Sequence, residues 1–294
     1  MKFTPEQFIS LRKAYDQGIN LTNLISSWGI PIDFEIISII YDFQSGTYTE
    51  NSNKNPDYIN AFTSEIVDTL CNFIEAEMTV LDCGTGEGTT IIPILKKLGM
   101  RSGYGIDASI SRVLWAQRNA AAAGINLNLA VSDLGQLPLN DNAVDVVVTV
   151  HALEPNHGRE GELIKELGRV ARRFMFLIEP DFEKASKRQR ERMMKLGYVR
   201  GLDDAINENN FRILDKVSIV NNSNELNVAL VTVVDTGKTK QEESNSTWVD
   251  PIHREELTPY MNGLRSTLGL WFPLVNSIPL LRSIDAQYLL SPPD

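Results

Sequence analysis

The alternation of short β-rich runs with helical patterns in the middle of the chain constrains the fold most. Strands are predicted at residues 78–83, 102–106, 127–131, 144–150 and 174–178. Helices are predicted between them at 89–98, 110–123 and 160–171, and a charged helix follows at 183–196. An antiparallel pair at 212–219 and 226–234 brings the total to about seven strands. Such alternation indicates an α/β protein with βαβ units wound around a mostly parallel sheet.

The segments on either side of this region have a different sequence pattern. Thr4, Pro5 and Gln7 form a helix-start signature, and residues 1–60 are expected to be short helices with a polar loop at 49–56. Residues 61–235 hold the α/β pattern, and 236–247 are polar without an aliphatic or aromatic anchor, which predicts a linker. Residues 248–294 are therefore expected to form a second, small domain.

Composition excludes several classes of protein. The 294 residues are 43% hydrophobic and 22% charged, as in a folded globular protein, and no apolar run is long enough to span a membrane. The formal charge of -10 disfavours nucleic acid and anionic lipid as partners. Cys71 and Cys83 are too few for a disulfide framework, and the N-terminus lacks the apolar core of a signal peptide. A cytoplasmic protein is expected.

A glycine-rich loop follows the first predicted strand. Residues 79–82 run into Cys83-Gly84-Thr85-Gly86-Glu87-Gly88 and then into a helix. Glycines at the carboxyl end of a strand let a ligand approach the backbone. Such loops also bind dinucleotides or simply permit a close crossing of helix and strand, so the loop alone leaves those alternatives open.

Acidic residues follow the first three predicted strands. Asp82 stands at the mouth of the loop, Asp107 ends the second strand, and Asp133 with Leu134 follows the third. The carboxyl ends of parallel strands meet at one edge of a sheet, so these residues can surround a single ligand. With this order of motifs, residues 60–235 resemble the class I S-adenosylmethionine-dependent methyltransferases, which have a Rossmann-like sheet.

The resemblance assigns a role to each motif. It places the loop glycines against the methionine part of the cofactor, Asp107 on the ribose hydroxyls, Asp133 with Leu134 at the adenine, and Asp82 at the methionine amino group. The residues expected to bind S-adenosylmethionine and its product S-adenosylhomocysteine are Asp82, Gly84, Thr85, Gly86, Asp107, Ala108, Asp133, Leu134, Val150, Tyr41, Gln44 and Tyr48. Carboxylates beside the glycines suit this cationic cofactor better than the pyrophosphate of NAD, the alternative on the same type of fold.

Three residues near the ends of later strands are candidates for catalysis. His151 directly follows the strand at 144–150, and a nearby carboxylate such as Glu154 can orient a histidine that accepts a proton. Glu179 ends the strand at 174–178 ahead of Pro180, which favours its projection over the same pocket. The competing interpretations are a structural histidine at a strand terminus, with its hydrogen bonds satisfied, and carboxylates that simply face water.

Two tyrosines precede the glycine loop in the segment 41–48. Tyr41 and Tyr48 are expected to belong to a lid over the cofactor, where their rings can face the sulfonium by cation-π attraction. Burial of aromatic surface is the competing explanation.

A narrower resemblance concerns the substrate. The segments at 41–48 and 151–156 are similar to those of methyltransferases of specialised metabolism, including C-methyltransferases of isoprenyl diphosphates. A diphosphate would need cations, with Mg²⁺ as a second cofactor in that case only, and the candidate side chains are Arg112, Arg118, Arg172 and Arg173. O- or N-methylation of another small metabolite is the alternative. Two further alternatives are a non-catalytic binding subunit and an RNA or protein methyltransferase.

Residues 248–290 are similar to the zinc-ribbon-like domains that accompany several methyltransferases. Asp250 and His253 stand where metal-binding relatives have their first cysteine pair, and Arg265 and Leu268 where they have the second. No soft tetrahedral ligand set exists, so no metal is expected. The segment is interpreted as a module that covers apolar surface or mediates self-association into a homodimer.

Overall fold

The predicted α/β alternation folds into one seven-stranded sheet with the order β3-β2-β1-β4-β5-β7-β6. The structure is a computed structural model and describes residues 3–222, 224–238 and 248–289. The strands are β1 (Val80–Cys83), β2 (Ser102–Asp107), β3 (Asn126–Val131), β4 (Val144–Val150), β5 (Ala171–Pro180), β6 (Arg212–Ser218) and β7 (Ala229–Asp235). Strands β1 to β5 pair in parallel, whereas β7 is antiparallel to both β5 and β6. The mostly parallel sheet and its final antiparallel pair are confirmed.

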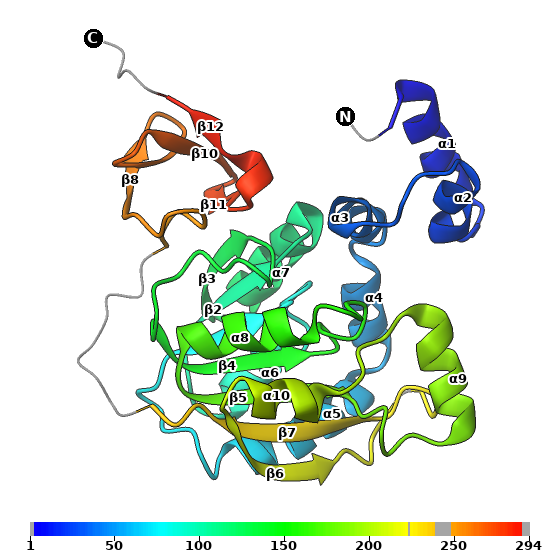
Figure 1. The fold of residues 1–294 in the computed structure, drawn as a ribbon, viewed down its shortest axis with the longest axis vertical. Coiled ribbons are helices and arrows are strands. Elements are labelled where there is room, and N and C mark those ends of the chain that lie inside the picture. The colour runs from blue at the N-terminus through cyan, green and yellow to red at the C-terminus, as the bar shows by residue number, and fades with distance from the viewer. Residues whose placement is uncertain (1–2, 223, 239–247, 290–294) are drawn as a thin grey trace.

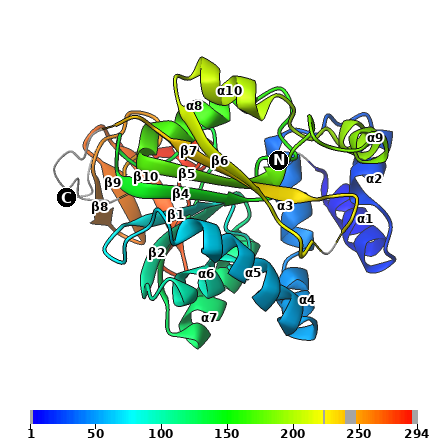
Figure 2. The same ribbon diagram turned by 90° about the horizontal axis from the view of Figure 1, so that it is seen from below.

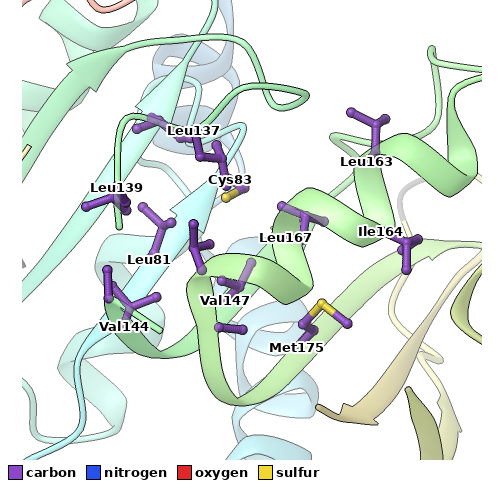
Figure 3. Close-up of a cluster of buried hydrophobic side chains, with 14 of the residues drawn as sticks. Leu81, Cys83, Leu137, Leu139, Val144, Val147, Leu163, Ile164, Leu167 and Met175 are labelled. Atoms are coloured by element: carbon purple, nitrogen blue, oxygen red, sulfur yellow. The ribbon is translucent and has the colours of Figure 1, made fainter. Parts of the chain in front are cut away.

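Helices cover both faces of this sheet (Figure 2). One face carries α5 (Pro56–Leu70), α6 (Ile91–Lys97) and α7 (Ile110–Ala123), and the other α8 (Glu160–Val170) and α10 (Leu202–Glu208). Neighbouring strand residues point to opposite faces, so Val146 and Val147 of β4 join different apolar clusters. Figure 3 shows the α8 face, where Leu167 lies toward Val147 and Met175 and Leu163 belongs to the same buried cluster. Burial on both faces explains why β4 is apolar at nearly every position.

The strand order places a switch point at β1. The chain moves from β1 to β2 and β3 on one side and then returns to form β4 on the other side of β1. Ligands of open α/β sheets bind in the crevice outside the carboxyl ends of the strands at such a point. The site is therefore expected where β1, β2, β3 and β4 end.

The N-terminal segment is helical, as predicted. It comprises α1 (Pro5–Asp16), α2 (Leu21–Ser27), α3 (Phe34–Phe43) and α4 (Thr47–Lys54). Thr4 and Gln7 form the predicted capping box at the start of α1. Leu11, Ile25 and Ile36 form a small core between these helices, separate from the clusters on the sheet. Residue 60, the expected end of this segment, lies inside α5.

The predicted polar loop at 49–56 is wrong, because most of it is helix α4. Lys54 donates to Glu50 at 2.5 Å, an i,i+4 pair that supports the helix. The start of α4 is capped by the distant carboxylate of Glu87, which no local pattern reveals. The charged helix α9 (Lys187–Leu196) also begins later than predicted, after a capping box at Ser186, and α10 was not predicted.

The C-terminal residues form a small antiparallel sheet. Its strands are β8 (Leu257–Tyr260), β9 (Gly263–Ser266), β10 (Leu270–Val275), β11 (Ile278–Pro279) and β12 (Gln287–Tyr288). It lies beside β3 and α7, as Figure 1 shows in orange and red. Phe272 and Leu281 share an apolar cluster with the main sheet, and Trp248 packs edge-on against Tyr104 with ring centroids 5.6 Å apart. Most of the predicted linker, residues 239–247, lies outside the described residues.

Asp250 occupies the interior of this small domain. Its fully buried carboxylate accepts hydrogen bonds from the backbone N–H groups of Ile252, His253 and Glu255 at 2.8, 2.7 and 3.3 Å. It therefore fixes the turn before β8 by hydrogen bonding. Within residues 3–222, 224–238 and 248–289, no three His, Cys, Asp or Glu side chains are grouped as a metal site. None of the helices in these ranges has the length and apolar character to cross a membrane.

Candidate cofactor and acceptor site

A cavity of about 310 Å³ lies at the carboxyl ends of β1 to β4, under α3 and α4. Residues expected to bind the cofactor line it from four strand ends: Gly84, Thr85, Gly86, Asp107, Ala108, Asp133, Leu134 and Val150. Tyr41 and Tyr48 line it from the N-terminal segment, and His151 and Glu154 from the loop after β4. Asp82, Gln44 and Glu179 do not reach its wall. The topology thus brings most of the predicted residues to one cavity.

The glycines of the loop serve different purposes. Gly86 has a φ of +52°, and a Cβ built on it meets nothing within 4 Å, so it faces open space in the cavity. Gly84 has a φ of +82°, and a Cβ there would lie 2.3 Å from the Cβ of Ala152. A Cβ on Gly88 would meet the Ile92 side chain at 2.8 Å. Only Gly86 therefore fits the expectation that glycine makes room for a ligand, and the other two permit close packing.

Asp107 joins the end of β2 to the glycine loop. Its carboxylate accepts hydrogen bonds from the backbone N–H groups of Gly86 and Ser109, both at 2.9 Å. Burial raises the pKa of Asp107, although these hydrogen bonds and Arg112 act in the opposite sense. Each carboxylate oxygen can accept a further hydrogen bond. Asp107 therefore holds the loop and keeps acceptor capacity toward the cavity.

Asp82 and Asp133 differ in exposure. Asp82 is buried behind the loop, and burial raises its pKa to about 7. Asp133 lines the cavity, accepts from the Gly135 N–H at 2.9 Å and lies 3.3 Å from the Arg159 guanidinium. Asp133 is therefore placed to contact a ligand, whereas Asp82 supports the loop from beneath.

The N-terminal helices are tied to the loop by buried acceptors. The Glu87 carboxylate accepts from the backbone N–H groups of Gly46 and Thr49 at 2.8 and 2.7 Å, which caps α4. The Asp42 carboxylate accepts from the Ser109 hydroxyl and the Ser111 N–H at the start of α7, at 2.5 and 3.0 Å. The predicted lid is therefore anchored to the same two segments that hold the cavity floor.

The cation over the two lid tyrosines is Arg112. Its guanidinium lies 4.1 Å from the centre of the Tyr41 ring and 4.8 Å from that of Tyr48, and it donates to Gln44 at 3.2 Å. These rings therefore already contact one cation within the protein, and the expectation that they also face the cofactor's sulfonium stays a prediction. Gln44 likewise supports Arg112 rather than lining the cavity.

His151 is held at the end of β4 in an unusual conformation. Its φ is +54°, a left-handed value uncommon for residues other than glycine, and its N–H donates to the Ile178 carbonyl at 2.9 Å. The imidazole stacks near Phe62, and Nδ1 lies 3.4 Å from the Glu154 carboxylate. Burial opposes protonation, but the hydrogen bond and charge of Glu154 outweigh it and raise the pKa of His151. The predicted His151 and Glu154 pair is therefore formed on the cavity wall.

Glu179 lies beneath the loop that carries His151. Its carboxylate accepts from the backbone N–H groups of Ala152, Leu153 and Glu154 at 3.0, 3.1 and 3.3 Å. Burial raises its pKa to about 7. It was expected to project over the pocket, but its hydrogen bonds turn it toward the backbone, which suits a positioning role for His151 and Glu154.

The central part of the chain matches a known family. Residues 80–173 match the methyltransferase domain family. This stretch contains β1 to β4, the glycine loop and most of the cavity floor. This part of the chain is therefore similar to a methyltransferase domain.

Individual proteins are similar to parts of the chain or share its fold. Ajmaline N-methyltransferase of Rauvolfia serpentina is 35% identical over 94 residues, 31% of this chain and 32% of that protein. The chain thus spans about a third of the length of that relative. Magnesium protoporphyrin IX methyltransferase of Synechocystis with bound S-adenosylhomocysteine has a TM-score of 0.53 at 19% identity, over 68% of this chain and 99% of that one. The same enzyme with S-adenosylmethionine gives 0.51 at 18% identity, over 71% and 99%. The fold is that of the class I methyltransferases.

Several residues at the cavity were not predicted from the sequence. Phe34 and Ile37 of α3 and Tyr198, which follows α9, line the cavity. Asn227, in the turn before β7, donates to the Glu154 carboxylate at 3.0 Å and accepts from Arg192 at 3.1 Å. These residues lie far from the glycine loop in sequence and follow no motif, so only the fold brings them to the site.

The two glycines that line the cavity should respond differently to alanine. We expect Gly84→Ala to lower the free energy of unfolding by about 2–4 kcal/mol, because the clash with Ala152 adds to left-handed strain. Gly86→Ala should cost about 1 kcal/mol but weaken binding of S-adenosylhomocysteine, since its Cβ enters the cavity. Urea unfolding and calorimetric titration measure both quantities. Equal losses of stability with unchanged affinity for Gly86→Ala would contradict this division.

The free energy of unfolding of the protein should fall as pH rises from about 5 to about 7. The pKa values of Asp82 and Glu179 are raised to about 7, so the native state keeps protons that the unfolded chain has already released. The raised pKa of His151 acts in the same sense but at higher pH, because its stabilisation is lost only above the usual pKa of a histidine, as the imidazolium deprotonates. Thermal unfolding across this range should show a falling midpoint, with a smaller slope in Glu179→Gln. A midpoint that rises in the wild type, or an unchanged slope in the variant, would refute the assignment.

Proposed function

We propose that the protein is an S-adenosylmethionine-dependent methyltransferase that acts on the hydroxyl or amine of a small molecule. One observation carries the proposal: a single cavity joins Gly86, Asp107 and Asp133 to the His151 and Glu154 pair. The methyltransferase family match and the cofactor-bound structures with the same fold support it.

The residues on the cavity wall fit this cofactor. Gly86 leaves open space where a side chain would stand, and Asp107 and Asp133 present carboxylates suited to hydroxyl and amino groups. Asp107 would hold the ribose and Asp133 with Leu134 the adenine. When bound, S-adenosylmethionine supplies an electrophilic methyl group on a positively charged sulfur.

The acceptor side of the cavity suits a largely apolar molecule with one protic group. Phe34, Ile37 and Tyr198 offer apolar and aromatic surface there. Glu154 orients the His151 ring through Nδ1, so that Nε2 can accept the proton of the acceptor hydroxyl or amine. The stacked Phe62 ring restricts the motion of the imidazole. Positioning of the acceptor is expected to supply much of the remaining rate enhancement.

C-methylation of an isoprenyl diphosphate is less well supported. Arg172 pairs with the buried Asp145 at 2.9 Å, and Arg173 lies 3.7 Å from Glu75. Arg118 stacks over Trp115, and Arg112 lies over the two lid tyrosines. Three of these four arginines lie outside the cavity wall, and Arg112, which lines it, is in contact with the two lid tyrosines. The wall also carries the carboxylates of Asp107, Asp133 and Glu154. A neutral or cationic acceptor suits this wall better than an anion.

The C-terminal sheet is proposed to be a ribbon-like module without a metal. The buried Asp250 supports this idea, because its carboxylate satisfies three backbone N–H groups near the position expected for a first cysteine pair. The hydrogen bonds to Asp250 would then stabilise this module in place of the metal ion that related domains bind.

Incubation with metabolite extracts tests the proposed activity. The protein and methyl-labelled S-adenosylmethionine would be mixed with small-molecule extracts, and labelled products would be identified by mass spectrometry. Transfer of label to a hydroxyl or amine that depends on His151 supports the proposal. Cofactor binding without turnover on any extract would favour a regulatory subunit, and label that appears only in RNA or protein would favour a macromolecular substrate.

A further inference from the structure

The C-terminal domain is attached to the edge of the main sheet next to the cavity. Leu280 forms a parallel bridge with Val131, the last residue of β3, and the Leu281 N–H donates to the Val131 carbonyl at 2.7 Å. The Ser132 hydroxyl donates to the Leu281 carbonyl at 3.3 Å. Residues 280–281 therefore run along the strand end that leads directly into Asp133 and Leu134, which line the cavity.

Arg282, the next residue, reaches two further parts of the site. One guanidinium nitrogen donates to the Ala108 carbonyl at 3.2 Å and to the Ser38 hydroxyl at 3.3 Å. Ser38 is buried on α3 and donates to the same Ala108 carbonyl at 2.8 Å. Figure 1 shows α3, α7 and the red C-terminal segment converging at this end of the molecule. A single side chain thus connects the C-terminal domain, the lid and the loop after β2.

The geometry of Arg282 is fixed from its other side. Asp285 accepts from Nε at 2.7 Å and from a terminal nitrogen at 2.9 Å, a bidentate pair with 17% and 12% of the side chains exposed. The pair carries no net charge, so Arg282 adds little repulsion toward a cationic cofactor. Because Ala108 follows Asp107 and lines the cavity, the contact acts on the backbone that presents Asp107.

We propose that Arg282 is a positioning residue for cofactor binding, by which the C-terminal domain holds the loop after β2 and helix α3 in their binding arrangement. This inference rests on the proposed use of S-adenosylmethionine. Attachment of the domain does not need Arg282, because Phe272, Leu281 and Trp248 already join the cluster on the main sheet. Its loss should therefore change the cavity more than the docking of the domain.

Calorimetric titration with S-adenosylhomocysteine tests the proposal on the full chain. We expect Arg282→Gln to weaken binding about tenfold, the usual scale for losing a hydrogen bond to a charged group. Asp285→Asn should weaken it less, because the arginine remains but is poorly oriented. Arg254→Gln is the matched control: Arg254 is in the same domain, lies 3.5 Å from Asp141 of the main domain and does not line the cavity. Its affinity should stay within about twofold of the wild type.

A double-mutant cycle separates positioning from general loss of stability. Ser38→Ala removes the hydroxyl that shares the Ala108 carbonyl with Arg282, so its effect on affinity should be less than additive with that of Arg282→Gln. Wild-type affinity in both Arg282→Gln and Asp285→Asn overturns the inference, and so does a loss of affinity in Arg254→Gln equal to that in Arg282→Gln. If Arg282→Gln does not fold, the affinities of Asp285→Asn and Ser38→Ala for S-adenosylhomocysteine still test the inference. Failure of the wild type to bind would instead refute the proposed function.

Discussion

Replacement of Asp107 by alanine should weaken binding of S-adenosylmethionine by about a hundredfold or more. The carboxylate accepts from the Gly86 and Ser109 N–H groups and faces the cavity from the end of β2. Its loss removes the expected ribose acceptor and also releases the one glycine that leaves open space in the cavity. Calorimetric titration with cofactor and product measures the change.

Two comparisons isolate this effect. Asp215→Ala removes an exposed carboxylate on β6, far from the cavity, and should leave affinity unchanged. Asp107→Asn keeps an acceptor oxygen but loses the charge, so it should fall between the wild type and Asp107→Ala. Circular dichroism and the unfolding midpoint confirm that each variant is folded. Wild-type affinity for S-adenosylmethionine in a folded Asp107→Ala variant would refute the cofactor assignment.

Replacement of His151 by asparagine should lower kcat by about a hundredfold or more, with product affinity nearly unchanged. Asparagine is the suitable replacement because it tolerates the left-handed backbone at φ +54° better than alanine does. The imidazole is paired with Glu154 at the cavity wall, whereas asparagine cannot accept a proton at neutral pH. Rates on the substrate found by mass spectrometry, measured across pH, provide the test.

Glu179→Gln distinguishes the two candidate bases. Its carboxylate accepts three backbone N–H groups and does not line the cavity, so we expect the variant to keep more than about a tenth of the wild-type kcat. The wild-type rate should rise with pH as His151 loses its proton, above the usual pKa of a histidine. Full activity in His151→Asn, together with loss of turnover in a folded Glu179→Gln, would transfer the role of base to Glu179.

Local patterns were sufficient for the sheet. The predicted ranges of β4 and α7 agree with the structure at both ends, because β4 is mostly apolar and α7 lies between a Ser109 cap and a left-handed Gly124. Asp107 and Asp133 come together because the parallel strands before them end at one edge. Periodicity and caps are visible in the sequence, and the meeting of the strand ends follows from the parallel winding that the sequence predicts.

Features that depend on distant partners were not visible. Residues 49–56 have the composition of a loop, yet α4 forms there because Glu87 caps it from 38 residues away. Tyr41 and Tyr48 were expected to face a cation, but which cation they face depends on the packing of Arg112 between α3, α4 and α7. Glu179 was expected in the pocket, but its carboxylate binds backbone N–H groups of the loop after β4 and therefore does not line the cavity.

The sequence by itself determined the α/β sheet, the glycine loop and the carboxylates at the strand ends, because each depends on neighbours in the chain or on the winding of parallel strands. Only the tertiary structure decided which polar groups face the cavity and which hold its walls. A buried carboxylate or guanidinium is directed by the nearest available partner, and those of Glu87, Glu179 and Arg282 come from remote segments.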